Sequence, residues 1–166
     1  MKPIALIGMM GSGKTTIGKQ LAKELHLPWH DSDLFIEQTT HEQIKDIFAT
    51  KGEAYFRTLE TRALQTLLTF PGILSTGGGI IIQKENREHL KNNAYVIFLE
   101  ASIQTLVTRI DDQNRPLLQN EPMEQKLRTL YDKRESLYRE CAHDTIKTDH
   151  KTVEEIITLI KQKLPQ

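Results

Sequence analysis

A short glycine-rich motif near the start of the chain constrains the fold more than any other feature. Residues 8–15 read Gly-Met-Met-Gly-Ser-Gly-Lys-Thr, which matches G-x-x-x-x-G-K-[ST], the phosphate loop that joins a strand to a helix. The glycines are needed because successive backbone N–H groups turn inward around phosphate oxygens, and side chains would obstruct that approach. A turn that merely joins strand to helix is a plainer explanation, but it does not account for four matching positions in this setting. The motif therefore predicts a nucleotide-phosphate site.

The residues of the loop hold phosphate in different ways. Lys14 is expected to reach the β- and γ-phosphates, and Thr15 offers a hydroxyl to Mg²⁺. The helix that begins there points the positive end of its dipole at the same anions. We expect the nucleotide-binding residues to be Gly11, Ser12, Gly13, Lys14, Thr15 and Thr16.

Apolar runs and helical patterns alternate along the chain. Three runs without polar alternation, typical of parallel strands buried on both faces, are residues 4–7, 73–75 and 95–99. Weaker strand candidates are residues 29–31 and 144–148, and the clearest helical patterns are 16–25 and 153–164. In such βαβ units the helices cover both faces of the sheet. The sequence predicts a three-layer α/β/α fold with a five-stranded parallel sheet.

Two stretches fall outside this alternation. Residues 40–68 are largely helical in pattern with no strand between them, which indicates a helical insertion beside the sheet, and we place a substrate-binding unit at about 33–62. Residues 111–122 are polar and contain two prolines, so we expect a mobile lid there. A length of 166 residues corresponds to a single domain, predicted to span 1–166.

Composition narrows the range of partners. The chain has 22 Lys and Arg against 22 Asp and Glu, and this zero net charge argues against nucleic acid or an anionic membrane as a partner. The one cysteine, Cys141, allows neither an intrachain disulfide nor a cysteine-based zinc site. The apolar run at 4–7 is broken by Gly8, well short of a signal or membrane segment. We expect a cytoplasmic protein that acts as a monomer on small molecules.

A phosphate loop leaves three classes open: a small-molecule kinase, a GTPase switch and an ATP-driven motor. A guanine-specific switch is expected to carry Asn-Lys-x-Asp, whereas the nearest run, residues 146–149, reads Ile-Lys-Thr-Asp. A motor domain is usually longer. A small kinase needs a second pocket and a lid that excludes water, and the two stretches outside the alternation can supply both.

Two acidic residues mark the second pocket. Asp31 and Asp33 directly follow the second strand, at the carboxyl edge where open α/β sheets bind ligands. One carboxylate can support Mg²⁺ through water, and the other can accept a hydrogen bond from a substrate hydroxyl and help to remove its proton. A plainer role for Asp33 is to cap the helix that follows, and the two roles can coexist.

Two arginines suit a substrate that carries a carboxylate. Arg57 lies three residues before Glu60 on one helical face, and Arg134 lies on a second helix. If both converge on a cleft, they can bind a carboxylate through bidentate hydrogen bonds. An intrahelical pair of Arg57 with Glu60, and a solvated surface position for either arginine, are the plainer explanations.

Glycines and two further arginines complete the candidate site. The run Gly77 to Gly79 ends the third strand and lets a ligand approach backbone N–H groups. Arg115, in the predicted lid, can close over a transferring phosphoryl group. Arg109, at the end of the preceding helix, can stack on an adenine face.

Together these motifs resemble those of the shikimate kinases, which are phosphate-loop proteins similar to the nucleoside monophosphate kinases. The resemblance spans nearly the whole chain, and the matching motifs in order are the phosphate loop at 8–15, D-x-D at 31–33, F-R-x-x-E at 56–60, G-G-G at 77–79 and R-P-L-L at 115–118. The last three in series are close to diagnostic. The resemblance implies ATP-dependent phosphorylation of the 3-hydroxyl of shikimate to shikimate 3-phosphate, with release of ADP, on the route to chorismate and the aromatic amino acids.

The resemblance also implies roles for individual residues. The catalytic residues would be Lys14, Asp33 and Arg115, with Asp33 as a possible base and the two cations on the phosphoryl group. The shikimate-binding residues would be Asp33, Arg57, Gly78, Gly79 and Arg134. ATP would be bound by residues 11–16, Arg109 and Arg115. Mg²⁺, the expected cofactor, would be ligated by Thr15, with Asp31 near its water shell.

Some features depart from the family pattern, and two alternatives remain. The lid run 111–115 reads Asp-Asp-Gln-Asn-Arg, with two acids where relatives often have basic residues, so it would attract phosphate less strongly. Gluconate kinase, which also phosphorylates a polyhydroxy acid, is the nearest alternative, although F-R-x-x-E and the triple glycine argue against it. A catalytically silent nucleotide-binding regulator would be expected to lack Lys14, Thr15 or Arg115, and all three are present.

Overall fold

Five strands form a single parallel sheet in the computed structural model, which describes residues 2–111 and 120–165. The strands are β1 (Ile4–Ile7), β2 (Trp29–Asp31), β3 (Ile73–Ser75), β4 (Tyr95–Glu100) and β5 (Asp144–Lys147). Their order is β2-β3-β1-β4-β5, and each neighbouring pair is parallel. The predicted sheet is thus confirmed, with β4 and β5 each differing from the predicted strand by one residue at the end.

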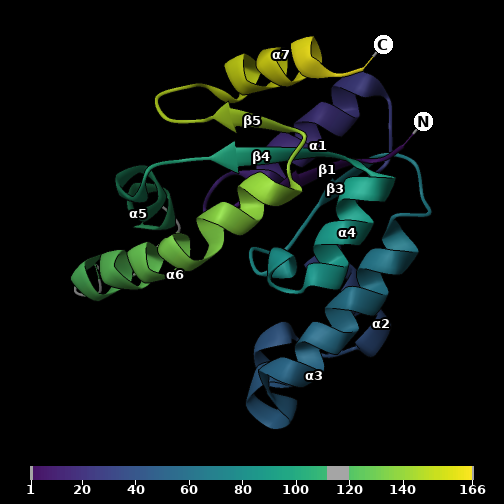
Figure 1. The fold of residues 1–166 in the computed structure, drawn as a ribbon, viewed down its shortest axis with the longest axis vertical. Helices are drawn as coiled ribbons and strands as arrows, with labels where there is room; N and C mark the ends of the chain where they lie inside the picture. Colours follow the sequence, from purple (N-terminus) through teal and green to yellow (C-terminus); the bar gives the residue numbers. More distant parts are fainter. Residues whose placement is uncertain (1, 112–119, 166) are drawn as a thin grey trace.

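Helices connect the strands and cover both faces of the sheet (Figure 1). They are α1 (Lys14–Leu25), α2 (Ser32–Thr40), α3 (Ile44–Leu67), the 3₁₀ helix η1 (Ile80–Ile82), α4 (Lys84–Asn93), α5 (Ile103–Asp111), α6 (Asn120–Cys141) and α7 (Val153–Lys163). Strand β1 lies between β3 and β4, and the chain goes from β1 to β2 on one side of it and later to β4 and β5 on the other. Strand order therefore reverses at β1, and such a switch point opens a crevice at the carboxyl ends of the strands.

The side chains of β1 alternate between two apolar cores. Ile4 and Leu6 pack with residues of α1 and α7, whereas Ala5 and Ile7 pack with residues of α3, α4, α5 and α6. Cys141, at the end of α6, is fully buried in the second of these cores. Burial of every β1 residue on both faces explains why this strand shows no polar alternation.

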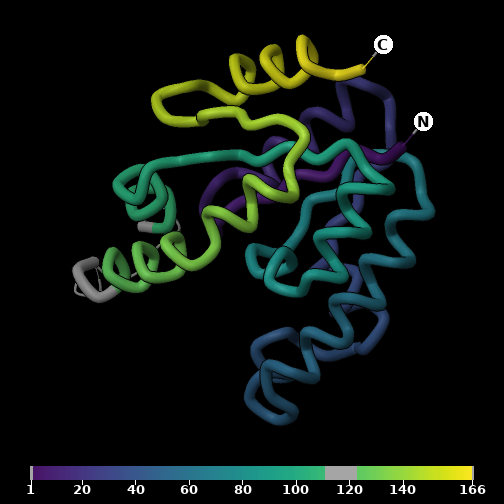
Figure 2. Tube along the Cα trace, in the orientation of Figure 1, coloured from purple at the N-terminus to yellow at the C-terminus, as the bar shows by residue number. Residues whose placement is uncertain are grey.

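A smaller, third apolar cluster holds α2 against the first part of α3. We call residues 32–63 the arm, which is the blue part of the trace at the bottom of Figure 2. Its buried residues are Ile36, Ile47, Phe56 and Ala63. Gly52 has φ 86° and ψ 170°, so α3 is kinked within the arm. The arm covers the stretch predicted to bind substrate, and that role stays a prediction.

The predicted lid overlaps the ends of two helices. Helix α5 extends to Asp111 and α6 begins at Asn120, so Pro122 lies in the first turn of a helix, where a missing N–H costs no intrahelical hydrogen bond. Residues 112–119, including Arg115, lie outside the described residues. Within the described part of the chain, every helix is too short or too polar to cross a membrane.

Candidate functional site

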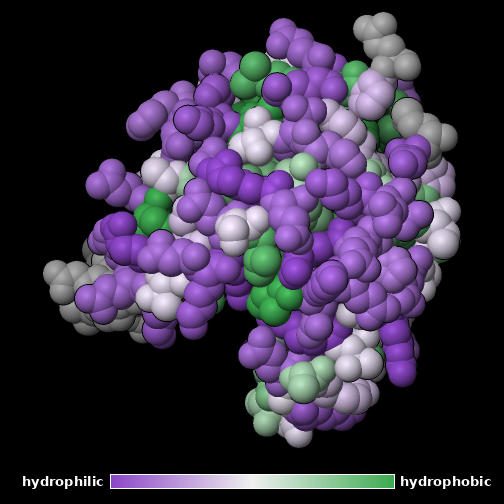
Figure 3. Space-filling model, viewed as in Figure 1, coloured by the Kyte–Doolittle hydropathy of each residue, from purple (hydrophilic) through white to green (hydrophobic). Residues whose placement is uncertain are grey.

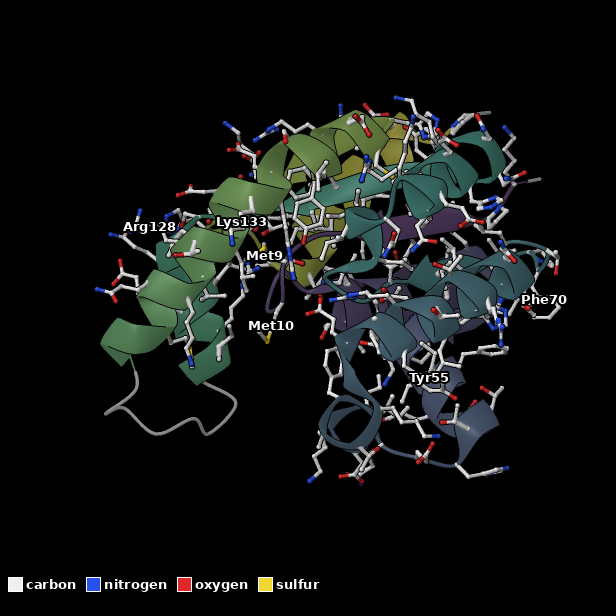
Figure 4. All side chains as sticks on the ribbon, turned by 60° about the horizontal axis from the view of Figure 1, so that its bottom comes forward. Met9, Met10, Tyr55, Phe70, Arg128 and Lys133 are labelled. Atoms are coloured by element: carbon white, nitrogen blue, oxygen red, sulfur yellow. The ribbon has the colours of Figure 1, made fainter. Side chains whose placement is uncertain are left out.

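A cavity of about 790 Å³ lies at the carboxyl ends of the strands, between the phosphate loop, the arm and α6. Figure 3 shows the molecule hollowed between the arm and the first part of α6, and in Figure 4 Met10 of the phosphate loop lies between those two parts. The predicted site residues that line the cavity are Gly11, Ser12, Gly13, Lys14, Thr15, Thr16, Asp31, Asp33, Arg57, Gly78, Gly79, Arg109 and Arg134. The structure thus brings together every predicted site residue except Arg115, which is not among the described residues.

The phosphate loop holds the ammonium group of Lys14 against its own backbone. The Lys14 Nζ atom donates hydrogen bonds to the Gly8 carbonyl at 2.5 Å and to the Met9 carbonyl at 3.0 Å. Gly13, which precedes α1, has φ 101°, a conformation that favours glycine. Burial lowers the pKa of Lys14 to about 8, although the negative charges of Asp33 and Asp31 oppose that shift. The ammonium is therefore held at the position where the loop would surround phosphate.

Arg109 fastens the phosphate loop to the segment after β5. Its guanidinium donates to the Ser12 carbonyl at 3.2 Å, to the Thr148 hydroxyl at 3.2 Å and to the Thr148 carbonyl at 3.1 Å. The N–H groups that make these hydrogen bonds lie in the plane of the guanidinium, so the bonds do not use its flat faces. The predicted stacking on adenine stays a prediction.

The suggestion that Asp33 caps the following helix is wrong, because Asp31 does so. The Asp31 Oδ1 atom accepts hydrogen bonds from the N–H groups of Asp33 at 2.9 Å and Leu34 at 3.0 Å. A capping residue needs an extended backbone, which Asp31 has as the last residue of β2, whereas Asp33 already lies in the first turn of α2. The other oxygen of Asp31 accepts a 3.5 Å hydrogen bond from the Thr15 hydroxyl.

Because Asp31 caps α2, the carboxyl of Asp33 is not needed for that role, and it faces the glycine run. A Cβ atom at Gly77 would lie only 2.8 Å from Asp33 Oδ1, so a side chain at that position would displace the carboxyl. Burial raises the pKa of Asp33 to about 6, and the charge of Asp31 adds to this effect while Lys14 opposes it. A carboxyl with this pKa can accept a proton near neutral pH.

Arg57 is held by two glutamates of its own helix and also faces the cavity. Its guanidinium binds Glu60 at 2.9 Å and Glu53 at 3.3 Å. A Cβ atom at Gly79 would lie 2.6 Å from the same guanidinium, so only glycine permits this close approach. Arg57 therefore pairs with Glu60 within its own helix and also lies at the cavity.

Glu60 is the most deeply buried acid of the site, with 1% of its side chain exposed. One of its oxygens binds Arg57, and the other has no hydrogen-bond partner within the described residues. Burial raises the pKa of Glu60 to about 7, against the opposing hydrogen bond from Arg57. The pair thus places a titratable group directly behind a candidate substrate-binding cation.

Two phenylalanines of α3 form an apolar wall of the cavity. Phe56 is buried, Phe48 is exposed at the rim, and their ring centroids are 4.8 Å apart. Arg134 reaches the cavity from α6 on the other side, close to Gly78. The arrangement offers cations at one end, a carboxyl beside them and an apolar surface, which suits a small ring that carries hydroxyl and carboxylate groups.

Three hydroxyls that organise this site were not predicted. Ser32 accepts a hydrogen bond from the Gly77 N–H at 3.0 Å, and Ser75 donates one to the Lys14 carbonyl at 2.6 Å. Tyr138 donates to the Gly78 carbonyl at 2.6 Å. Each lies beside a recognised motif, and Tyr138 follows Arg134 by one helical turn, so its position on the same face of α6 could have been predicted.

Comparisons with known proteins agree on one family. The family model described as shikimate kinase matches residues 10–165. A shikimate kinase of Sulfurihydrogenibium sp. is 43% identical over 98% of this chain and 100% of its own length. One from Psychrobacter cryohalolentis is 44% identical over 97% of this chain and 88% of its own. The structure of a shikimate kinase from Acinetobacter baumannii in complex with shikimate matches with a TM-score of 0.88 and 42% identity, over 99% of this chain and 96% of that one.

Proposed function

The chain belongs to the shikimate kinase family, and on this premise we propose which of its residues carry out the reaction. The protein transfers a phosphoryl group from ATP to the 3-hydroxyl of shikimate, giving shikimate 3-phosphate and ADP on the route to chorismate and the aromatic amino acids. One observation carries the assignment of residues: the phosphate loop, Asp33 and Arg57 line one cavity. Both substrates can therefore bind next to each other there.

On the nucleotide side, Lys14 neutralises charge on the phosphoryl group during transfer. Its ammonium leaves the Gly8 and Met9 carbonyls for the phosphate oxygens, which are stronger acceptors because they are charged. Residues 11–16 surround the phosphates, Arg109 contacts the adenine, and Arg115 reaches the transferring group from the lid. The expected gain from Lys14 and Arg115 is greatest in the transition state, where charge spreads over the transferring oxygens.

Mg²⁺ fits the oxygen groups beside the loop. The Thr15 hydroxyl and the nearer Asp31 oxygen lie 3.5 Å apart, and both are ligand types that Mg²⁺ accepts. Among the described residues no group of three His, Cys, Asp or Glu side chains could hold a metal alone, so substrate phosphates and water would complete the shell. When bound, Mg²⁺ supplies positive charge on the phosphate oxygens.

On the acceptor side, Arg57 and Arg134 hold the shikimate carboxylate, together with backbone N–H groups at Gly78 and Gly79. The carboxyl of Asp33 orients the attacking hydroxyl and accepts its proton as the oxygen bonds to phosphorus, while ADP leaves. Its raised pKa suits that transfer better than an ordinary aspartate would, because the proton is held more firmly near neutral pH. Phe48 and Phe56 cover the ring.

The remaining proposals concern the setting of the enzyme. We place it in the cytoplasm as a monomer that binds shikimate and ATP, without nucleic acid or a membrane. The free thiol of Cys141 supports a reducing compartment, and the zero net charge argues against nucleic acid and an anionic membrane as partners. The unit of function is the whole chain, with the arm at about 33–62 binding shikimate and the lid at about 111–122 closing over ATP.

A coupled assay of ADP release tests the proposed function. The protein is mixed with ATP and Mg²⁺, and then with shikimate, gluconate or nucleoside monophosphates in turn. We expect release only with shikimate, because gluconate lacks the rigid ring that, in shikimate, fixes the distance between the carboxylate and the 3-hydroxyl. Release with gluconate instead would support the alternative kinase, and release with none of them would support a silent regulator.

A further inference from the structure

Tyr138 makes a polar contact that none of the roles above uses. Its side chain is fully buried on α6, and its ring stacks on Phe98 of β4, with centroids 5.0 Å apart and planes 18° apart. The hydroxyl, at the far end of this packed ring, donates a 2.6 Å hydrogen bond to the Gly78 carbonyl. A short bond from an immobile side chain to the backbone fixes the orientation of that peptide group.

The geometry of a trans peptide then determines where the next N–H points. The described residues contain no cis peptide bond, so the Gly78 carbonyl and the Gly79 N–H lie in one peptide plane and point in opposite directions. With the carbonyl turned toward Tyr138, the Gly79 N–H is turned away from it. Within the described residues this N–H has no hydrogen-bond acceptor, and Gly79 lines the cavity next to the Arg57 guanidinium.

The glycine run needs such a restraint. Glycine adopts more backbone conformations than other residues, so a peptide between two glycines can rotate unless something holds it. Burial raises the pKa of Tyr138 to about 12, despite the opposing effect of the Arg134 guanidinium. The hydroxyl therefore keeps its proton, and remains a donor, throughout the pH range in which the enzyme works.

Tyr138 also joins the two groups proposed to bind the carboxylate. Arg134 lies one turn before it on α6, and the Gly78–Gly79 peptide lies at its hydroxyl. We propose that Tyr138 is a positioning residue for the shikimate carboxylate: it turns the Gly79 N–H into the cavity, where that group donates a hydrogen bond to the carboxylate. The inference rests on the proposed function and deepens its account of substrate binding.

Tyr138→Phe removes the hydroxyl and keeps the stacked ring. We expect KM for shikimate to rise about tenfold or more, the effect of weakening one hydrogen bond to a charged group, with kcat changed less than threefold and ATP affinity unchanged. The matched control is Tyr131→Phe, on the same helix, whose hydroxyl faces Glu135 and Glu100 rather than the glycine run. It should leave KM unchanged.

Comparing shikimate with its methyl ester shows whether Tyr138→Phe affects binding of the carboxylate in particular or loosens the fold in general. The ester lacks the carboxylate charge, so its affinity should fall less in Tyr138→Phe than the affinity for shikimate does. An equal loss for both compounds, or a wild-type KM in the variant, would overturn the proposal. Failure of the unmutated protein to release ADP with shikimate would instead overturn the proposed function.

A measurement on the unmutated protein keeps the proposal testable if the variant does not fold. With ¹⁵N-labelled glycine, the Gly79 amide proton should move downfield when shikimate binds and move less when the methyl ester binds. An amide that responds equally to the two compounds would show that Gly79 does not contact the carboxylate, and the proposal would fail.

Discussion

Position 14 shows how a single side chain can serve two states of the site. The Lys14 ammonium is buried on its own loop, where two neutral carbonyls accept its hydrogen bonds. Burial of this charge opposes folding, as its lowered pKa indicates, and binding of charged phosphate would relieve that cost. Its contribution to catalysis and its contribution to stability should therefore have opposite signs.

Lys14→Met tests this opposition. We expect kcat to fall by roughly 10²-fold or more, since the ammonium no longer stabilises charge on the transferring oxygens. The thermal midpoint of the ligand-free protein should stay the same or rise, because methionine fills similar space without a buried charge. A folded variant with near-normal turnover would show that Lys14 has no catalytic role.

Arg57→Lys distinguishes planar recognition of a carboxylate from simple attraction of charge. A lysine keeps the charge but cannot form two parallel hydrogen bonds, so we expect it to behave almost like Arg57→Ala. Loss of such a contact commonly costs about 2 to 5 kcal/mol, and kcat/KM for shikimate should fall by roughly two orders of magnitude or more. ATP affinity, measured by titration, should barely change. Wild-type kcat/KM in the lysine variant would reduce Arg57 to a partner of Glu60.

The pH dependence of kcat/KM for shikimate follows from three buried groups. The reaction needs Asp33 ionised, and the Arg57–Glu60 pair is strongest with Glu60 ionised, so activity should rise as pH increases through about 6 to 7. It should fall above pH 8, where the free enzyme loses the Lys14 charge. Because both acids have pKa values raised by folding, they favour the folded state below about pH 4, and this contribution is lost as pH rises through 6 to 7.

Variants assign the limbs of this profile. In Glu60→Gln, kcat/KM for shikimate should rise in a single step near pH 6 rather than across pH 6 to 7. Asp33→Asn should lower kcat while ATP binding is retained. If kcat/KM of the unmutated enzyme instead rises near pH 4, that result would contradict the raised pKa of Asp33.

The sequence predicts where the residues of this site lie, but it does not predict all of their hydrogen-bond partners. Asp31 and Asp33 were expected at the carboxyl edge, where the structure has them, but the choice of helix cap depended on the residue at which β2 ends and α2 begins. A difference of two residues reverses the roles of the two acids. The hydrogen bond of Tyr138 to Gly78 crosses 60 residues of sequence, and no local pattern contains it.

At the scale of elements, the contact between α1 and β3 couples the two halves of the site. The buried Ser75 hydroxyl donates to the Lys14 carbonyl and accepts from the Trp29 indole at 3.0 Å. Helix α1 approaches this closely because Gly18 has no side chain there: a Cβ atom would lie 2.3 Å from Ser75 Oγ and 2.8 Å from Trp29 Nε1. The glycine run begins two residues after Ser75, so the residue that binds α1 also lies next to that run.

Gly18→Ala should destabilise the protein although alanine is the better helix former by about 1 kcal/mol. The added methyl group overpacks a filled space, which typically costs about 1 to 3 kcal/mol. We expect a lower free energy of unfolding in urea and a lower kcat. Adding Ser75→Ala removes the nearest atom and should recover part of the loss. Strictly additive effects of the two substitutions would show that this contact does not set the spacing of α1.

The elements themselves could largely be predicted, since strands buried on both faces and helices with one apolar face leave different patterns. The kink at Gly52 could not be predicted, because a lone glycine in a helical pattern also fits an unbroken helix. The start of α6 at Asn120 could not be predicted either, since Pro122 indicates a turn as readily as the first turn of a helix.

At the scale of the whole molecule, the arm depends on the smallest of the three apolar clusters that the described residues form. Four buried residues form this cluster, whereas each core beside the sheet has at least twelve. Shikimate bound between the arm and the sheet would add contacts that join the two. The arm should therefore gain more protection from the ligand than any other part of the described chain.

Amide hydrogen exchange with and without shikimate tests this expectation. We expect exchange to slow most in α2 and in α3 up to Phe56, and least in α7, which lies on the opposite face of the sheet. ATP alone should slow exchange chiefly in the phosphate loop and the start of α1. Uniform slowing in all helices would show that the arm is no less stable than the sheet.

The buried thiol of Cys141 gives the molecule a practical property. Burial raises its pKa to about 11, so the thiolate that reacts with maleimides and oxidants is scarce at neutral pH. The folded protein should therefore react very little with such reagents. In the variant Tyr55→Cys, which places a thiol at an exposed position on the arm, the reagent should label the new cysteine and leave Cys141 unlabelled. A fluorophore at that site could follow the arm in real time without any other residue being altered first.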